Sequence, residues 1–247
     1  AGCTVDGRLC VWNEEEVRGE GGSVRPTFSF KLKSRGDDAR TPLHCLSNPF
    51  ADRPTAKDPF LFAVQARDEA HYDAPSGSYN LIKIMLQPPK TLPDDCQIDM
   101  LQRWVLAPVM ETNIWTLAGT NRLASTILDD TTLAVLGLTE GLKIWAEVEG
   151  QKGVLFHYDE FKEDNSKIRA IALRPHHPDV ATAHVDGRIL LHHGLLSEAV
   201  SSLASLARVD PTLRRARLRA SHRVATRVLH WHAHAPPALR FAGPGLL

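Results

Sequence analysis

The sequence predicts an all-β protein built from short strands that recur along the chain. Short apolar runs rich in Val, Ile and Leu alternate with polar residues, which is typical of half-buried strands. Asp6-Gly7 and Asp186-Gly187 each stand between two such runs, and Asp-Gly suits the positive φ of a tight hairpin. One stretch alone, 195–207, carries apolar residues at helical spacing.

The expected elements follow the chain in order, each strand bounded by Gly, Pro, Asn or Asp. The expected strands are 9–12, 28–32, 60–65, 80–86, 104–106, 132–137, 142–145, 154–158, 168–173, 180–184 and 189–192. The helix at 195–207 follows from a stripe of Leu195, Leu196, Ala199, Val200, Leu203, Leu206 and Ala207.

The strand pattern repeats at a regular distance. Trp12 and Trp145 each end a strand-like unit, and they stand 133 residues apart, which is about three times 44. His192 ends a further unit 47 residues after Trp145. Asp6 and Asp186 each precede the last residue of their unit by six positions. Strands that recur at about 44 residues are typical of the blades of a β-propeller.

These residues resemble the WD-repeat β-propeller family. The resemblance implies structural positions at the turn residues Asp6 and Asp186, at Trp12 and Trp145, at His192 in the place of a Trp, and at His234 before an innermost strand. The match departs from the family at Thr139 and Glu140, which stand where the turn Asp is expected.

The spacing between these structural positions divides residues 1–247 into about four to five blades. A half-blade ends near residue 35, three units cover about 41–108, 111–159 and 167–232, and a last one begins near 235. A helical or irregular basic insertion, 194–227, interrupts the fourth unit. Because the chain begins and ends within units, we expect it to be an incomplete propeller and a segment of a longer protein.

Two stretches, 167–189 and 228–241, are most similar to the NET-associated nuclear protein (WD repeat protein 75) family. That resemblance implies a scaffold subunit of the small-subunit processome in the nucleus and nucleolus. Its expected partners are sibling WD-repeat subunits and pre-ribosomal RNA, and its expected role is early small-subunit ribosome biogenesis. The alternative is a WD-repeat adaptor for a ubiquitin ligase or a signalling complex.

Composition narrows the classes of function. The 29 Lys and Arg residues balance 29 Asp and Glu, which disfavours a protein that coats nucleic acid or an anionic membrane over its whole surface. The sequence contains no apolar run long enough for a membrane helix. The four cysteines, Cys3, Cys10, Cys45 and Cys96, form no CxxC pair, so we expect reduced thiols and no zinc ribbon.

Catalytic motifs are absent from the sequence. It contains no G-x-S-x-G elbow and no Gly-rich phosphate loop, so we expect no enzyme activity, no cofactor and no small-molecule substrate. Alternating His230, His232 and His234 would share one face of a strand. No carboxylate or Cys stands at ligand spacing beside them, so we interpret these histidines as structural and expect no metal.

The candidate binding site is a basic segment near the end of the chain. It holds seven arginines against the single acid Asp210, namely Arg208, Arg214, Arg215, Arg217, Arg219, Arg223 and Arg227. Arg binds phosphate through two parallel hydrogen bonds, so the segment suits the RNA backbone. An acidic protein partner or a solvated loop are the alternatives, and no aromatic residue is interleaved to stack on bases.

Overall fold

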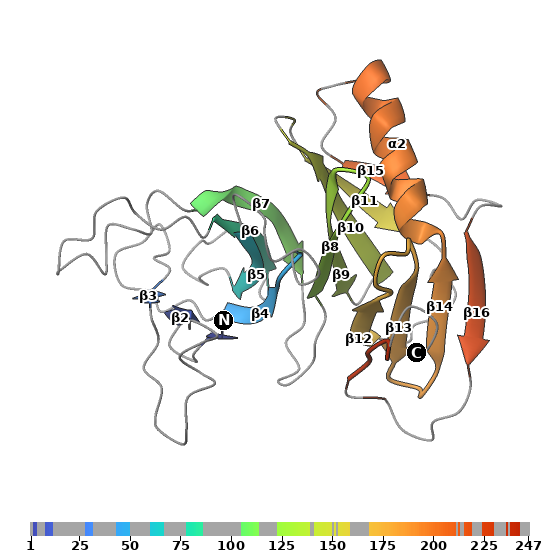
Figure 1. Ribbon diagram of the computed structural model, residues 1–247, viewed down its shortest axis with the longest axis horizontal. Coiled ribbons are helices and arrows are strands. Elements are labelled where there is room, and N and C mark those ends of the chain that lie inside the picture. The colour runs from blue at the N-terminus through green and yellow to red at the C-terminus, as the bar shows by residue number, and fades with distance from the viewer. Residues whose placement is uncertain are drawn as a thin grey trace. The chain divides into compact units, whose positions relative to one another are not determined.

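In the computed structural model, the chain divides into two compact units (Figure 1). They comprise residues 1–46 with 56–113, and residues 47–55 with 114–247. The structure describes residues 2–3, 8–11, 28–31, 43–49, 60–66, 78–85, 105–113, 123–138, 141–149, 151, 153–158, 168–210, 212, 215–218, 224–229, 236 and 238–242.

The first unit contains two sheets. One has the order β1-β2-β3 and is antiparallel throughout, with strands Gly2–Cys3, Arg8–Val11 and Phe28–Lys31. The other has the order β4-β5-β6-β7, with strands Leu43–Ser47, Phe60–Ala66, Ser78–Met85 and Val105–Asn113. The second sheet is therefore a meander, in which neighbours along the chain are neighbours in the sheet.

The second unit repeats this arrangement with one addition. An antiparallel meander runs through β8, β9, β10 and β11, which are Leu123–Leu128, Thr131–Leu138, Gly141–Val148 and Val154–Tyr158. A fifth strand, β15 (Arg215–Leu218), pairs parallel to β11 at the edge of this sheet. The added strand comes from much later in the chain.

The second meander of this unit consists of β12, β13, β14 and β16, which are Ile168–Leu173, Val180–His184, Ile189–His193 and Ala225–Leu229. Every residue of β13 is buried. Small Ala181 and Ala183 lie on one face of this strand, where Leu239 and Phe241 pack nearby. Val180, Thr182 and His184 lie on the other face because side chains alternate along a strand.

Two hairpins in this unit use different turn chemistry. Asp129 and Asp130 both have positive φ, 46° and 58°, in the two-residue turn between β8 and β9. At the Asp186-Gly187 turn, only Gly187 has positive φ, 86°. The hydrogen bonds from Gly187 N to His184 O and from His184 N to Arg188 O close a three-residue loop with glycine in the left-handed position. The prediction of a tight turn at Asp186 is confirmed.

Helix α2, Leu195–Val209, connects β14 to β15. It begins after Gly194, whose left-handed φ of 75° turns the chain out of the strand, and it ends at Asp210, whose N–H donates to Leu206 O. Leu195, Leu196, Ala199 and Leu203 are buried on one face, as the predicted stripe requires, whereas Ala207 is exposed. The helix extends two residues beyond the predicted end.

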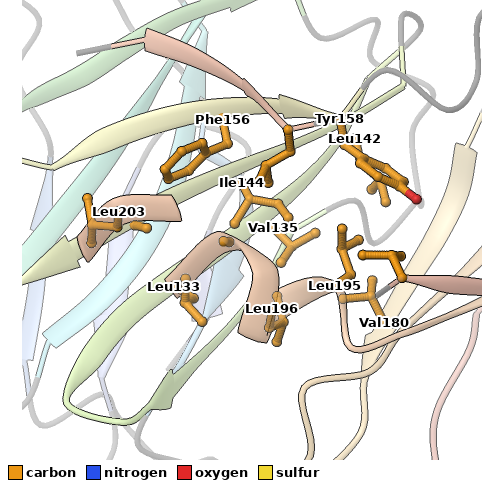
Figure 2. Close-up of a cluster of buried hydrophobic side chains, with 14 of the residues drawn as sticks. Leu133, Val135, Leu142, Ile144, Phe156, Tyr158, Val180, Leu195, Leu196 and Leu203 are labelled. Carbon is orange, nitrogen blue, oxygen red and sulfur yellow. The ribbon is translucent and has the colours of Figure 1, made fainter. Parts of the chain in front are cut away.

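The core of the second unit joins both sheets and the helix. Figure 2 shows Leu195, Leu196 and Leu203 of α2 directed toward Leu133, Val135, Ile144 and Phe156 of the five-stranded sheet. Ile168, Ile171 and Val180 bring the other sheet into the same cluster. Gly137 permits the close approach, because a Cβ at this position would lie 2.7 Å from Ile168 Cγ2.

The predicted all-β class is confirmed, with one helix among the described residues. The meanders span 43–113, 123–158 and 168–229, close to the units expected at 41–108, 111–159 and 167–232. None of the expected strands corresponds to β1, β4, β8, β15 or β16. The basic insertion ends earlier than expected, because 225–227 pair with β14 as part of β16.

Candidate functional site

A buried chain of polar side chains lies within the sheet that contains β14. Thr182 Oγ1 lies 2.9 Å from His184 Nε2 and 3.4 Å from His192 Nε2, and His192 Nδ1 lies 3.2 Å from Thr226 Oγ1. His192 is fully buried. Each hydroxyl and ring nitrogen can donate or accept, so the chain connects three neighbouring strands without an unpaired charge. This cluster stabilises the sheet.

Asp179 forms a second polar cluster at the beginning of β13. Its Oδ2 accepts from Arg174 Nη1 at 2.9 Å and lies 3.2 Å from His193 Nδ1, while Oδ1 accepts from Gly194 N at 3.0 Å. Burial raises the pKa of Asp179, but the bonds from Gly194, Arg174 and His193 outweigh burial and lower the pKa overall. The carboxylate therefore stays charged and ties the turn before β13 to the start of α2.

Trp145 and His192 occupy the same place in successive meanders. Each lies on the third strand, β10 or β14, and each is buried. His192 faces the five-stranded sheet, where its ring contacts Tyr158 edge-on with centroids 5.8 Å apart. Trp145 lies on the face of its own sheet opposite to Ile144, which belongs to the shared core.

The predicted basic segment is divided among three elements. Arg208 is exposed in the last turn of α2, Arg217 is exposed on β15, and Arg227 is exposed on β16. Arg215 begins β15, which is anchored by buried Leu218. Among the described residues of this segment, 208–209 belong to the helix, 215–218 to β15 and 225–227 to β16.

A groove of about 280 Å³ lies between α2 and β15. Phe156, Leu206 and Ala216 provide its apolar lining. Its polar lining comprises Glu198, Ser201, Ser202, Ser205 and Arg217. Oε2 of Glu198 is buried and has no hydrogen-bond partner among the described residues, which leaves a strong acceptor unsatisfied.

The remaining predicted site residues fall outside the described residues. These are Asp6, Trp12 and His234 among the propeller positions, and Arg214, Arg219 and Arg223 in the basic segment. No motif in the sequence pointed to Asp179, Thr182, Glu198 or Thr226. Thr182 lies on the same hairpin as Asp186 and stands ten residues before His192. This spacing could have identified Thr182 as a cross-strand neighbour of His192. Glu198 carries no such signal, because its importance depends on a strand from elsewhere in the chain.

Neither the protein-family models nor the curated proteins with which the sequence was compared match this chain. Among the described residues, no helix is long and apolar enough to cross a bilayer. Within the same part of the chain, His, Cys, Asp and Glu side chains form no group of three or more that could bind a metal ion.

Proposed function

We propose that this chain is part of a WD-repeat β-propeller that acts as a non-catalytic scaffold. The observation that carries the proposal is the repeated four-stranded meander, in which Trp145 and His192 occupy equivalent third-strand positions. Propeller blades are four-stranded meanders repeated around an axis. Packing of one meander of the second unit on the next, through Leu133, Ile168 and their neighbours, supports this arrangement.

The polar contacts within the last meander support the WD-repeat assignment. His192 stands where the family places a Trp, and it bonds to Thr182 on the adjacent strand. Asp186 accepts from the backbone N–H of Arg188 at 3.1 Å and from the Arg188 guanidinium, so it stabilises its turn locally. The His192 contact joins β13 to β14, and the Asp186 contacts hold the turn between these two strands, which suits a rigid scaffold.

The proposed biological role is early small-subunit ribosome biogenesis in the nucleolus, as a subunit of the small-subunit processome. It is supported by the resemblance of 167–189 and 228–241 to that family. The partners would be sibling WD-repeat subunits and pre-ribosomal RNA. The exposed Arg208, Arg217 and Arg227 would contact phosphates, which dominate affinity for nucleic acid. A WD-repeat adaptor of a ubiquitin ligase or signalling complex is the second candidate.

Affinity purification of the tagged chain from cells tests this role. We expect other processome subunits and the small nucleolar RNA of that particle to co-purify. A ribonuclease-treated sample separates partners held by protein contacts from partners held through RNA. Recovery of a cullin-type ligase or a receptor, without processome subunits, would contradict the proposal and favour the adaptor.

A further inference from the structure

The fifth strand of the five-stranded sheet, β15, comes from a connection within the neighbouring sheet. β14 and β16 are adjacent strands of one meander, yet the residues between them, 194–224, include α2 and β15, and β15 pairs with β11 of the other sheet (Figure 1). The corresponding connection in the preceding meander, from β10 to β11, takes only 149–153. The longer connection therefore adds a strand to a meander that already has four.

The edge that β15 covers differs from the outer edge of the next sheet. β11 has the sequence Val-Leu-Phe-His-Tyr and is buried at every position except His157, whereas β16 is exposed at Arg227 and Val228. Among the described residues, no further strand pairs with the outer edge of β16. An apolar edge strand invites pairing with another chain, and proteins protect such edges with charge or with an additional element. β15 provides this protection at β11.

The attachment of β15 to the sheet depends on few residues. Leu218 is buried in the core and Ala216 packs against it, whereas Arg217 is exposed. β15 has four residues, against eight in β10. It pairs parallel to β11, while every other strand pair with a described register is antiparallel. Because parallel pairing is slightly less stable per residue, opening of β15 alone should require less free energy than unfolding of the meander that it covers.

We propose that β15 is a releasable cover on β11, and that two copies of this chain form a dimer by exchanging their covers. Each copy places its own Arg215–Leu218 on the β11 of the other, in the register that holds within one chain. Because the exchanged contacts are identical to the intrachain contacts, a second copy fits the vacated edge without further adaptation. The balance of 29 basic and 29 acidic residues leaves no net charge that would repel it. This exchange is independent of RNA binding.

Two introduced cysteines distinguish exchange of the cover from other modes of association. His157 lies opposite Arg217 in the strand register. With the four native cysteines replaced by serine, His157→Cys and Arg217→Cys in one chain should form an intrachain disulfide that fixes the cover. The unaltered chain should dimerise increasingly with protein concentration, whereas the fixed variant should stay monomeric until it is reduced. Sedimentation velocity measures these samples. A dimer of the fixed variant, or a monomer of the unaltered chain at every concentration, would overturn the proposal.

A mixture of two single variants then locates the exchange. His157→Cys on one chain and Arg217→Cys on a differently tagged chain, in the same serine background, should form a disulfide between the chains, because each β15 pairs with the β11 of the other. In the control mixture Val209→Cys, an exposed position of α2, replaces Arg217→Cys and reports random collisions. We expect about tenfold or more cross-linked product in the first mixture, because pairing raises the effective concentration of the two thiols. Equal yields in the two mixtures would overturn the proposal.

Discussion

The ring of His192 contacts the ring of Tyr158 edge-on, with an interplanar angle of 85°. The two residues belong to different sheets of the second unit, on β14 and β11, and both are fully buried. The contact therefore links the hydrogen-bonded chain of Thr182 and Thr226 to the core of the neighbouring sheet. A histidine here provides both a packing surface and two polar atoms.

This contact predicts a measurable coupling. We expect a double-mutant cycle of Tyr158→Leu and His192→Leu to give a coupling free energy of about 0.5–1.5 kcal/mol, the range for edge-to-face ring pairs. Urea titration of the four proteins measures it. Additive effects of the two substitutions would show that the rings do not interact in solution.

Trp145→Ala should lower the free energy of unfolding by about 3–5 kcal/mol, because the indole is buried. A Cβ on Gly153 would overlap the indole ring, so Gly153→Ala should cost about 1–3 kcal/mol through overpacking. Denaturant titration checks both. A negligible loss for Trp145→Ala would mean that the side chain faces solvent and that the assigned repeat phase is wrong.

Helix α2 should depend on its buried face. Leu196→Ala leaves a cavity in the core shown in Figure 2 and should cost about 2–5 kcal/mol. Val209→Ala, on the same helix but 83% exposed, is the control and should change stability by less than about 0.5 kcal/mol. Thermal unfolding monitored by circular dichroism distinguishes them. Similar effects of the two substitutions would contradict the packing of this helix.

Stability should fall in acid through Asp179. Its pKa is lower in the folded protein than in the unfolded chain, despite the opposing effect of burial, because Gly194, Arg174 and His193 bind the charged form. The stabilisation is therefore complete above the ordinary pKa and is lost as the pH falls through the lowered one. Asp179→Asn should be less stable at pH 7 and lose less stability between about pH 5 and pH 3. Urea titrations across that range measure this, and parallel curves for the two proteins would contradict the expectation.

The basic segment should give RNA binding a defined salt dependence. Each phosphate contact contributes about −0.7 to the log–log slope of single-strand affinity against salt. Changing Arg214, Arg215, Arg217 and Arg219 together to Ser should therefore flatten the slope by about 2.8, for all sequences alike. Filter binding at several salt concentrations measures this. Arg240→Ser, an exposed residue outside the segment, should leave the slope unchanged.

An unchanged slope in the fourfold variant would exclude phosphate contacts by these arginines. If RNA binding persists while a protein partner is lost from pull-downs, the segment binds an acidic protein instead. If the fourfold variant keeps both RNA binding and its protein partners, the segment is a solvated surface that binds neither. Arg217 is exposed and β15 pairs through its backbone, so the change at this position should affect the free energy of unfolding by less than about 0.5 kcal/mol.

The strand pattern and the helix could be predicted because their signals are local. Short apolar runs such as 142–145 and 180–184 mark strands, and the stripe from Leu195 to Leu206 marks a helix, within a few residues of the chain. The Asp186-Gly187 turn was recognisable for the same reason. The Asp129-Asp130 hairpin was missed because it lacks the glycine that marks most such turns. β15 was missed because its sequence, Arg-Ala-Arg-Leu, reads as a charged surface.

By itself, the sequence determined the all-β class, the repeating units and the concentration of arginine near the end of the chain. Only the tertiary structure decided that β15 pairs with β11. In this pairing Arg215 lies opposite Leu155, which stands 60 positions earlier in the chain. The tertiary structure also decided that Glu198 and Arg217 line one groove. The physical reason is that backbone pairing and side-chain proximity across such distances depend on how buried faces pack, and a local pattern reports only which face is buried.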